Sequence, residues 1–293
     1  MIIVKLQGGL GNQMFQYAAG RALSLRHGVE LKADLTFLLD RNLSDVVFRD
    51  FDISIFPDVA FPTATGAEIS RVKPSGNSSL FSRVSRKFFY SRYYFKEKGF
   101  SFNPKFNILG PSIYLDGYWQ TEKYFKDIEG QIRSDFRFDN LHIPANVELL
   151  EKIRSCDAVC LNVRRGDYVT NSHSSSMHGF IGLDYYRHAV EKINSEVKDP
   201  HYFIFSDDIQ WSKEHIQTGR ETTIVNHDHA GPRFADYLQL MAACKYFIIP
   251  NSTFAWWAAW LSSSGKQVIA PLQWFADSRY DSMDIIPAKW TRI

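Results

Sequence analysis

The sequence predicts an α/β protein built in two halves, and two observations carry that prediction. A strand, a glycine-rich turn, a helix and a second strand follow one another in residues 1–33, which is the order of a βαβ unit. From residue 159 onward, apolar strands again alternate with polar loops and helices. We therefore expect two α/β domains, 1–145 and 146–293, with their boundary in the polar segment 139–147.

The first half contains short apolar runs and one well-marked helix. Three runs rich in β-favouring residues predict strands: residues 1–7, 29–33 and 112–116. Residues 12–27 carry apolar side chains at helical spacing, and Gly28 is a typical helix stop. A second helix is expected at 122–136, whereas prolines punctuate the irregular segment 57–112.

The second half continues the alternation. Its predicted strands are residues 159–163, 202–206, 246–249 and 267–270. Its predicted helices are residues 183–197, 235–244 and 253–261. Trp256, Trp257 and Trp260 sit in an alanine-rich helix, so we expect them to pack in the core. Strands joined by helices run parallel, and open α/β sheets bind ligands at the carboxyl ends of such strands.

The composition is that of a globular protein, with 45% hydrophobic and 23% charged residues. A formal charge of +2 gives no reason to expect a nucleic-acid partner. The three cysteines show neither a disulfide framework nor a zinc spacing, and Cys160 and Cys244 are expected in the core. The chain opens with a strand-like run, and its apolar run 254–261 is too short to span a bilayer, so we expect a cytoplasmic protein.

Two arginines follow directly after the strand 159–163. Arg164 and Arg165 therefore lie at the carboxyl end of a parallel strand, and a guanidinium grips phosphate through two parallel hydrogen bonds. The alternative is a surface loop with an arginine–aspartate ion pair. The motif indicates an anion site if this edge of the sheet binds a ligand.

The strand 202–206 ends in two carboxylates, Asp207 and Asp208. They do not form the Asp-X-Asp clasp of a metal site. One of them can cap the helix that begins near Ile209, since aspartate is a good N-cap. The other can accept the two N–H donors of a guanine edge. We give cap and ligand roles equal weight, one for each aspartate.

A polar cluster opens the last predicted helix, and it consists of Asn251, Ser252, Thr253 and Phe254. Ser252 or Thr253 caps the helix. Unpaired N–H groups at a helix start, together with two hydroxyls, predict an anion site. The alternative is a capped core helix that binds no ligand.

The glycine-rich turn of the first half spans residues 8–13. Gly9 and its neighbours let backbone amides approach a ligand, and Asn12 and Gln13 open a helix whose N-terminus favours anions. The spacing is not G-x-G-x-x-G and no lysine follows, so neither a dinucleotide fingerprint nor a phosphate loop is predicted. Glycine-rich first turns are common in α/β folds, so this turn alone assigns no ligand.

Two other segments favour structural interpretations. Residues 83–98 mix basic and aromatic side chains, which predicts a helix packed in the core or, less favoured, a patch on an anionic membrane surface. Binding to anionic vesicles would test the second interpretation. His227-Asp228-His229 is favoured as a solvated loop over a metal site.

Six motifs in a fixed order resemble those of the α-1,2-fucosyltransferases of glycosyltransferase family 11. They are GGLGNQMFQYAAGRAL (8–23), GYWQTEKYF (117–125), NVRRGDYV (162–169), HGFIGLDYY (178–186), FSDD (205–208) and NSTFAWWAAWL (251–261). The resemblance spans most of the chain, and the arginine and Asn-Ser-Thr-Phe motifs are specific. It implies a GT-B fold, in which two Rossmann-like domains face a cleft, the first on the acceptor side and the second holding GDP-fucose.

The resemblance implies inverting, metal-independent transfer of fucose to the 2-hydroxyl of a terminal galactose, in an oligosaccharide or a surface polysaccharide precursor. No cofactor is implied. The residues that match the family's motifs receive these roles: Arg164 on the GDP phosphates, Ser252 and Thr253 lining them, Asp207 or Asp208 on guanine or ribose, and Asn12 with Gln13 facing the reacting sugar.

An inverting transfer also needs a base for the acceptor hydroxyl. Asp167 is the first candidate and His178 the second. The departing diphosphate develops negative charge, which Arg164 and the helix start at Ser252 can stabilise without a metal.

The chain departs from the family's pattern at two positions. Asn162 stands where the family usually has histidine, and Ala255 stands where it often has serine. Asparagine cannot act as a base near neutral pH, so no catalytic role carries over to Asn162.

Two alternative functions stay open: a GT-B transferase with another nucleotide sugar, and a non-catalytic glycan- or nucleotide-binding module. Competition between donors would distinguish GDP-fucose from another nucleotide sugar. Turnover of any donor would reject the non-catalytic binding module. A lipid-linked acceptor and a peripheral position at the inner face of the membrane would suit the segment 83–98.

Overall fold

The structure is a computed structural model, and it describes the chain except for residues 43–47, 60, 74–91, 166–178, 180 and 278. Two predicted catalytic residues, Asp167 and His178, lie outside the described residues. The chain divides into two compact units. Unit 1 comprises Met1–Arg137 and Met283–Ile285, and unit 2 comprises Phe138–Ser282 and Ile286–Ile293. The domain boundary expected from the sequence lies between residues 145 and 146.

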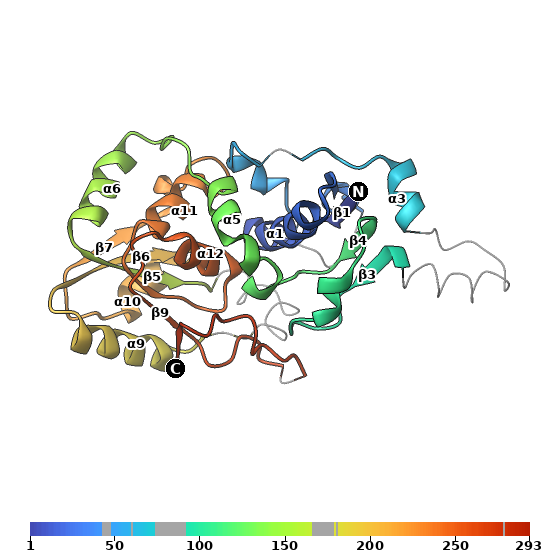
Figure 1. Cartoon of the computed structure of the whole chain (residues 1–293). Helices are drawn as coiled ribbons and strands as arrows, with labels where there is room; N and C mark the ends of the chain where they lie inside the picture. Colours follow the sequence, from blue (N-terminus) through green and yellow to red (C-terminus); the bar gives the residue numbers. More distant parts are fainter. Residues whose placement is uncertain (43–47, 60, 74–91, 166–178, 180, 278) are drawn as a thin grey trace. The chain divides into compact units, whose positions relative to one another are not determined.

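Unit 1 is a four-stranded parallel sheet with a helix on each face (Figure 1). Its strand order is β2-β1-β4-β3, and its strands are β1 (Ile2–Lys5), β2 (Leu31–Asp34), β3 (Tyr94–Lys96) and β4 (Ile113–Asp116). Helix α1 (Leu10–His27) packs against the face that carries Val4, because Gly20 brings the helix close to that side chain. Helix α3 (Gly66–Val72) covers the opposite face, where Ile3 and Tyr114 lie in one apolar cluster.

Two elements of unit 1 differ from the expectation. The helix expected at 122–136 is broken into 3₁₀ turns at Glu122–Tyr124 and Lys126–Ile128 and the helix α5 at Glu129–Asp135. Phe125 leaves helical geometry, with φ −137°, and its ring packs 6.2 Å from that of Phe15. The helix favoured for 83–98 is wrong at Tyr94–Lys96, which is strand β3; residues 83–91 lie outside the described residues. Tertiary packing decides here, because Tyr94 stacks on Tyr114 of the neighbouring strand.

Unit 2 is a six-stranded parallel sheet in the order β10-β9-β8-β5-β6-β7. Its strands are β5 (Asp157–Val163), β6 (Pro200–Ser206), β7 (Thr222–Val225), β8 (Tyr246–Ile248), β9 (Gln267–Ala270) and β10 (Thr291–Arg292). Its described residues form the helices α6 (Ala145–Ser155), α9 (Leu183–Glu196), α10 (Ile209–His215), α11 (Ala235–Ala242) and α12 (Thr253–Leu261). The remaining short helices are α2 (Thr36–Leu39) in unit 1 and 3₁₀ helices at Asp52–Ile55, Pro104–Ile108, His227–His229 and Pro232–Phe234.

Helices cover both faces of the unit 2 sheet (Figure 1). Leu161 of β5 packs with Ile193 of α9 on one face. On the other face, Phe205 of β6 meets the Tyr237 ring of α11 edge-on at 5.0 Å. Helix α6 was not among the expected helices, and its buried side chains are those of Asn146, Leu150 and Ile153.

Each sheet reverses its strand order at one point. In unit 1 the reversal lies between β1 and β4, and in unit 2 it lies between β5 and β8. Open α/β sheets bind ligands at such topological switch points, outside the carboxyl ends of the two strands. The polar clusters that the sequence indicated follow β1, β5 and β8, so the fold places them at these two points.

Candidate functional site

The arginine motif follows β5, and a carboxylate at the end of β6 orients it. The Arg165 backbone N–H donates to Asp207 Oδ1 at 2.8 Å, and Arg164 Nη1 lies 3.0 Å from Asp207 Oδ2. The arginine–aspartate ion pair considered from the sequence therefore exists, with Asp207 as one partner. It joins the carboxyl ends of the neighbouring strands β5 and β6, and it orients the Arg164 guanidinium there.

The second arginine is held from two sides. Arg165 Nε lies 3.3 Å from Asp208 Oδ2, and its guanidinium stacks 4.0 Å from the Trp211 ring centre. Asp208 also caps α10, because its carboxylate accepts from the Trp211 N–H at 3.1 Å. The predicted division of roles is confirmed for the cap, which is Asp208. Of the two arginine side chains, Arg164 is the more exposed, at 32% against 18% for Arg165.

Trp211 was missed in the sequence. Nothing in the sequence shows that the Arg165 guanidinium reaches this ring. One signal was present in the sequence. If Asp208 caps the helix, Trp211 lies in the first turn of α10, beside the end of β6.

The polar cluster after β8 opens α12 at the same switch point. Ser252 is the N-cap, and its side chain accepts from the Ala255 N–H at 3.4 Å. Thr253 and Phe254 lie in the first turn and are half-buried. Asn251 is buried, and its Nδ2 donates to the Trp274 carbonyl at 3.1 Å. The three tryptophans of α12 are buried as expected, so packing fixes the position of this helix start.

The glycine-rich turn follows β1 in unit 1. Gly8 has φ +76°, and a Cβ there would lie 2.4 Å from Asn12 Nδ2, so the turn requires glycine at this position. Gly9 is the N-cap of α1, and its carbonyl accepts from the Asn12 and Gln13 N–H groups. Asn12 is half-buried, and its Oδ1 accepts from Gln120 Nε2 at 2.8 Å.

The expectation that Gln13 faces a sugar does not agree with the structure. Gln13 is fully buried. Its Nε2 donates to the carbonyls of Gly8 and Asp50, and its Oε1 accepts from the N–H groups of Asp52 and Ile53. Both ends of the amide are thus used to hold the segment 50–53 against the glycine-rich turn, so the side chain serves the fold.

The Asn162 side chain also makes a hydrogen bond within the fold. It is buried in β5, and its Nδ2 donates to the Phe205 carbonyl of β6 at 3.0 Å. The departure from the family's usual histidine thus leaves a side chain that ties two central strands together.

A carboxylate at the end of β3 organises the turn after β4. Glu97 accepts from the backbone N–H groups of Tyr118 at 2.6 Å and Trp119 at 3.1 Å. Burial raises the pKa of Glu97 to about 7, against the lowering effect of these two donors, and the nearby Asp116 charge adds to the rise.

The raised pKa makes stability depend on pH. The folded protein holds a proton on Glu97 at pH values where the unfolded chain, with a pKa of 4.5, has lost it. Stability from this group is therefore complete below pH 4.5 and declines as the pH rises through about 7. We expect the wild type to lose stability relative to Glu97→Gln between pH 5 and 8 in urea unfolding. A constant difference across this range would contradict the raised pKa.

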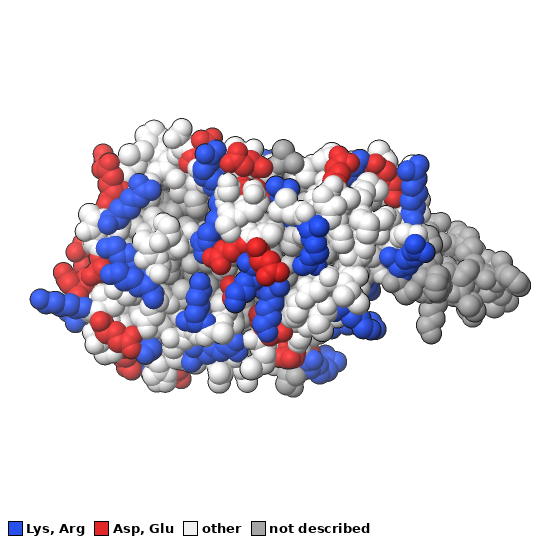
Figure 2. Space-filling view, viewed as in Figure 1, with Lys and Arg blue, Asp and Glu red and all other residues white. Residues whose placement is uncertain are grey.

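The remaining candidates lie elsewhere. His227 and Asp228 are exposed, as the solvated-loop interpretation expected. In the described part of the chain, no three His, Cys, Asp or Glu side chains converge in a way that could hold a metal ion. Figure 2 shows basic and acidic side chains intermixed on the visible face.

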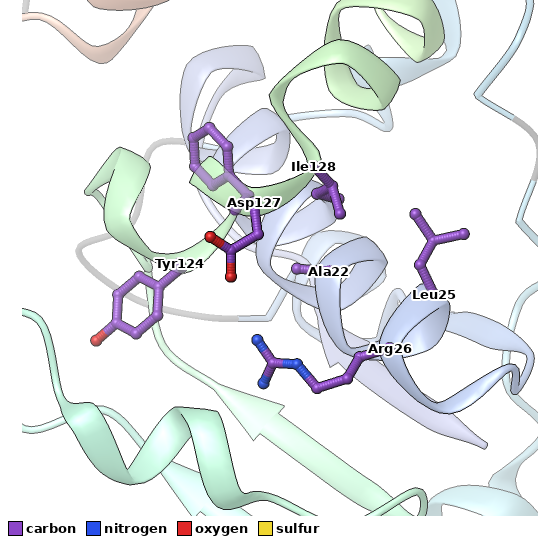
Figure 3. Close-up of a pocket in the computed structure, with 7 residues that line it drawn as sticks. Ala22, Leu25, Arg26, Tyr124, Asp127 and Ile128 are labelled. Carbon is purple, nitrogen blue, oxygen red and sulfur yellow. The ribbon is translucent and has the colours of Figure 1, made fainter.

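A pocket of about 310 Å³ lies beside the last turns of α1, between Leu25 and the segment 124–128 (Figure 3). At a rise of 1.5 Å per residue, Leu25 is about 20 Å along the helix from Asn12, so this pocket is separate from the switch-point residues. No helix within the described ranges is both long and apolar enough to cross a membrane.

Two α/β units with parallel sheets, each with polar residues at its switch point, are the architecture of the GT-B fold class. The chain belongs to glycosyl transferase family 11, whose model matches residues 84–293. Both the family and the fold class expected from the sequence are thereby confirmed.

Two relatives and one solved structure are similar to this chain over at least nine tenths of its length. An alpha-1,2-colitosyltransferase of Escherichia coli is 32% identical over 100% of this chain and 99% of its own length. The O-antigen biosynthesis glycosyltransferase WbnK of Escherichia coli is 30% identical over 92% of this chain and 94% of its own. The fucosyltransferase NodZ from Bradyrhizobium has the same fold, with a TM-score of 0.51 at 14% identity over 96% of each chain.

Proposed function

We propose that this enzyme transfers fucose from GDP-fucose to the 2-hydroxyl of a terminal galactose, with inversion at the anomeric carbon. The observation that carries the proposal is Arg164, fixed by Asp207 at the switch point of unit 2. The acceptor galactose belongs to an oligosaccharide or a surface polysaccharide precursor, and the name of the relative WbnK supports this second class.

The diphosphate binds where Arg164 and the start of α12 lie. As the bond between the sugar and the diphosphate breaks, negative charge grows on the leaving oxygen. Arg164 offers a fixed positive charge with several N–H donors, and the first N–H groups of α12 add their partial positive charge. These groups stabilise the leaving diphosphate without a metal. Arg165 pairs with Asp208 and stacks on Trp211, so its guanidinium is fixed at the same strand end.

The acceptor hydroxyl loses its proton to a carboxylate or an imidazole. Asp167 and His178 stay the predicted bases, and both lie outside the described residues. An oxocarbenium-like transition state makes a weak demand on a base, so a modest effect of replacing Asp167 agrees with this mechanism. The lipid-linked acceptor and the peripheral membrane position also stay predictions, because residues 83–91 lie outside the described part of the chain.

One observation supports GDP-colitose as a second candidate donor. The relative that is 32% identical along the full chain transfers colitose according to its name. Colitose is fucose without its 3-hydroxyl, so the two donors differ by one hydrogen-bonding group. A site that hydrogen-bonds this hydroxyl would reject the deoxy sugar, whereas an apolar site would accept both.

The test is GDP release from GDP-fucose, with and without galactose-terminated acceptors, in the presence of a chelator. We expect acceptor-dependent release that the chelator leaves unchanged. Stronger turnover of GDP-colitose than of GDP-fucose would replace the donor and keep the reaction class. Strict dependence on an added divalent metal would overturn the metal-free mechanism, and no release from any nucleotide sugar would leave a binding module.

A further inference from the structure

The turn after β4 is held in an unusual conformation. Trp119 is fully buried and has φ +59°, a value that bulky residues rarely adopt. Glu97 holds this conformation by accepting two backbone N–H groups. Gly117 permits the approach, because a Cβ there would lie 2.4 Å from the Glu97 Cβ. Strained turns of this kind persist where the surrounding structure enforces them, and they cluster at functional sites.

The strained turn delivers Gln120 to the start of α1. Gln120 is 5% exposed, and its Nε2 donates to Asn12 Oδ1 at 2.8 Å. Its own Oε1 is buried and has no hydrogen-bond partner among the described residues. An isosteric apolar side chain would avoid this cost, so packing alone does not account for glutamine at this position.

The bond decides which end of the Asn12 amide meets a substrate. With Oδ1 turned to Gln120, the Asn12 side chain directs its Nδ2 donors elsewhere. Nδ2 lies beside Gly8, at the carboxyl end of β1 and the first turn of α1. Asn12 is half-buried there, at the switch point of unit 1.

We infer that Gln120 is a positioning residue, which fixes the Asn12 amide so that Nδ2 donates to an oxygen of the reacting substrates. The inference rests on the proposed function and on the role that the family resemblance implies for Asn12, which is to face the reacting sugar. The ligand atom is an oxygen acceptor, and it belongs either to the GDP-sugar or to the acceptor glycan.

The test is Gln120→Glu, which keeps the size of the side chain and removes its donor. The ionised carboxylate accepts from Asn12 Nδ2, so the Asn12 amide turns over and points Oδ1 at the substrate. We expect kcat at pH 8 to fall roughly 30-fold. Protonation restores an O–H donor, and burial raises the pKa of the new carboxyl, so we expect activity relative to wild type to recover toward pH 6.

The nearby charged groups require a wild-type profile over the same pH range. They are Glu97 after β3, which accepts hydrogen bonds from the same turn, Asp116 at the end of β4 and Arg49 beside Gly9. All three are present in both proteins, so the ratio of variant to wild type reports the new carboxyl together with its coupling to Glu97. Gln217→Glu is the matched control, because Gln217 is exposed in unit 2, and we expect it to keep wild-type kcat at each pH.

A second variant separates orientation from structure. Gln120→Met removes donor and acceptor together and leaves the Asn12 amide able to rotate, so we expect a smaller, pH-independent fall in kcat. Equal losses in both variants without recovery at low pH would make Gln120 merely structural. Near-normal kcat in Gln120→Glu would also overturn the inference. If Gln120→Glu does not fold, wild-type kcat in Gln120→Met overturns it, and a pH-independent fall supports it.

Hydrolysis of the donor in the absence of acceptor shows which substrate carries the oxygen that Asn12 Nδ2 contacts. If Asn12 contacts the GDP-sugar, Gln120→Glu lowers both hydrolysis and transfer. If it contacts the acceptor glycan, the variant lowers transfer alone. A wild type that releases no GDP from GDP-fucose contradicts the proposed donor and not the positioning role, and the variants are then compared with the donor that the wild type uses.

Discussion

Replacing Arg164 with alanine is expected to lower kcat for transfer from GDP-fucose by about 10²–10³, as loss of a preorganised donor to a developing negative charge does elsewhere. The guanidinium is fixed by Asp207 at 3.0 Å, at the carboxyl end of β5. It therefore needs no rearrangement as the diphosphate leaves. The measurement is initial-rate GDP release at saturating acceptor, with kcat and KM for the donor determined separately.

The fold should survive this change. The Arg164–Asp207 pair is partly exposed, so its loss costs about 1 kcal/mol or less, and Asp207 keeps its bond to the Arg165 N–H. Arg187→Ala is the matched control, because Arg187 is an exposed arginine of α9 with an ion pair to Asp184. We expect wild-type kinetics from the control. Near-normal kcat in Arg164→Ala would remove Arg164 from the phosphate site.

Replacing Trp256 with alanine is expected to lower the free energy of unfolding of unit 2 by about 3–5 kcal/mol, the range for a buried aromatic reduced to alanine. The side chain is 0% exposed. Its ring contacts those of Trp257 at 5.0 Å, Trp260 at 6.1 Å and Trp290 at 5.4 Å. The cavity would open directly under the first turn of α12, one turn from the Ser252 cap.

Urea unfolding followed by far-ultraviolet circular dichroism measures this loss without relying on tryptophan emission. Trp256→Phe is the control, since it keeps an aromatic ring in the same space and should lose much less stability. If Trp256→Ala folds, we also expect a raised KM for the donor, because the helix start loses its support. A loss below about 1 kcal/mol would show that this cluster does not stabilise α12.

The periodic elements could be predicted from the sequence, and the contacts between them could not. All seven expected strands and the helices around 12–27, 183–197, 235–244 and 253–261 are present with ends within two residues. Periodicity and glycine or aspartate punctuation are local properties, so they are readable. Strand β3 was not, because its pairing with β4 depends on aromatic contacts to a strand 20 residues away in sequence order.

The candidate site shows the same limit. Arg164, Asp207 and Ser252 could be selected because each follows an apolar strand. Gln13 was misassigned, since its four hydrogen bonds reach Gly8 and the segment 50–53, which the sequence gives no reason to place beside it. Gln120 was overlooked as a site residue for the converse reason: its bond to Asn12 joins residues 108 positions apart.

The stacking of Arg165 on Trp211 has a consequence for the entropy of binding. An arginine side chain loses roughly 2 kcal/mol of rotamer freedom when it is immobilised. Trp211 and Asp208 impose that loss while unit 2 folds, before any anion is present. The entropic cost of ordering Arg165 therefore lowers the free energy of unfolding of the ligand-free protein. A nucleotide that binds later does not have to order this side chain again.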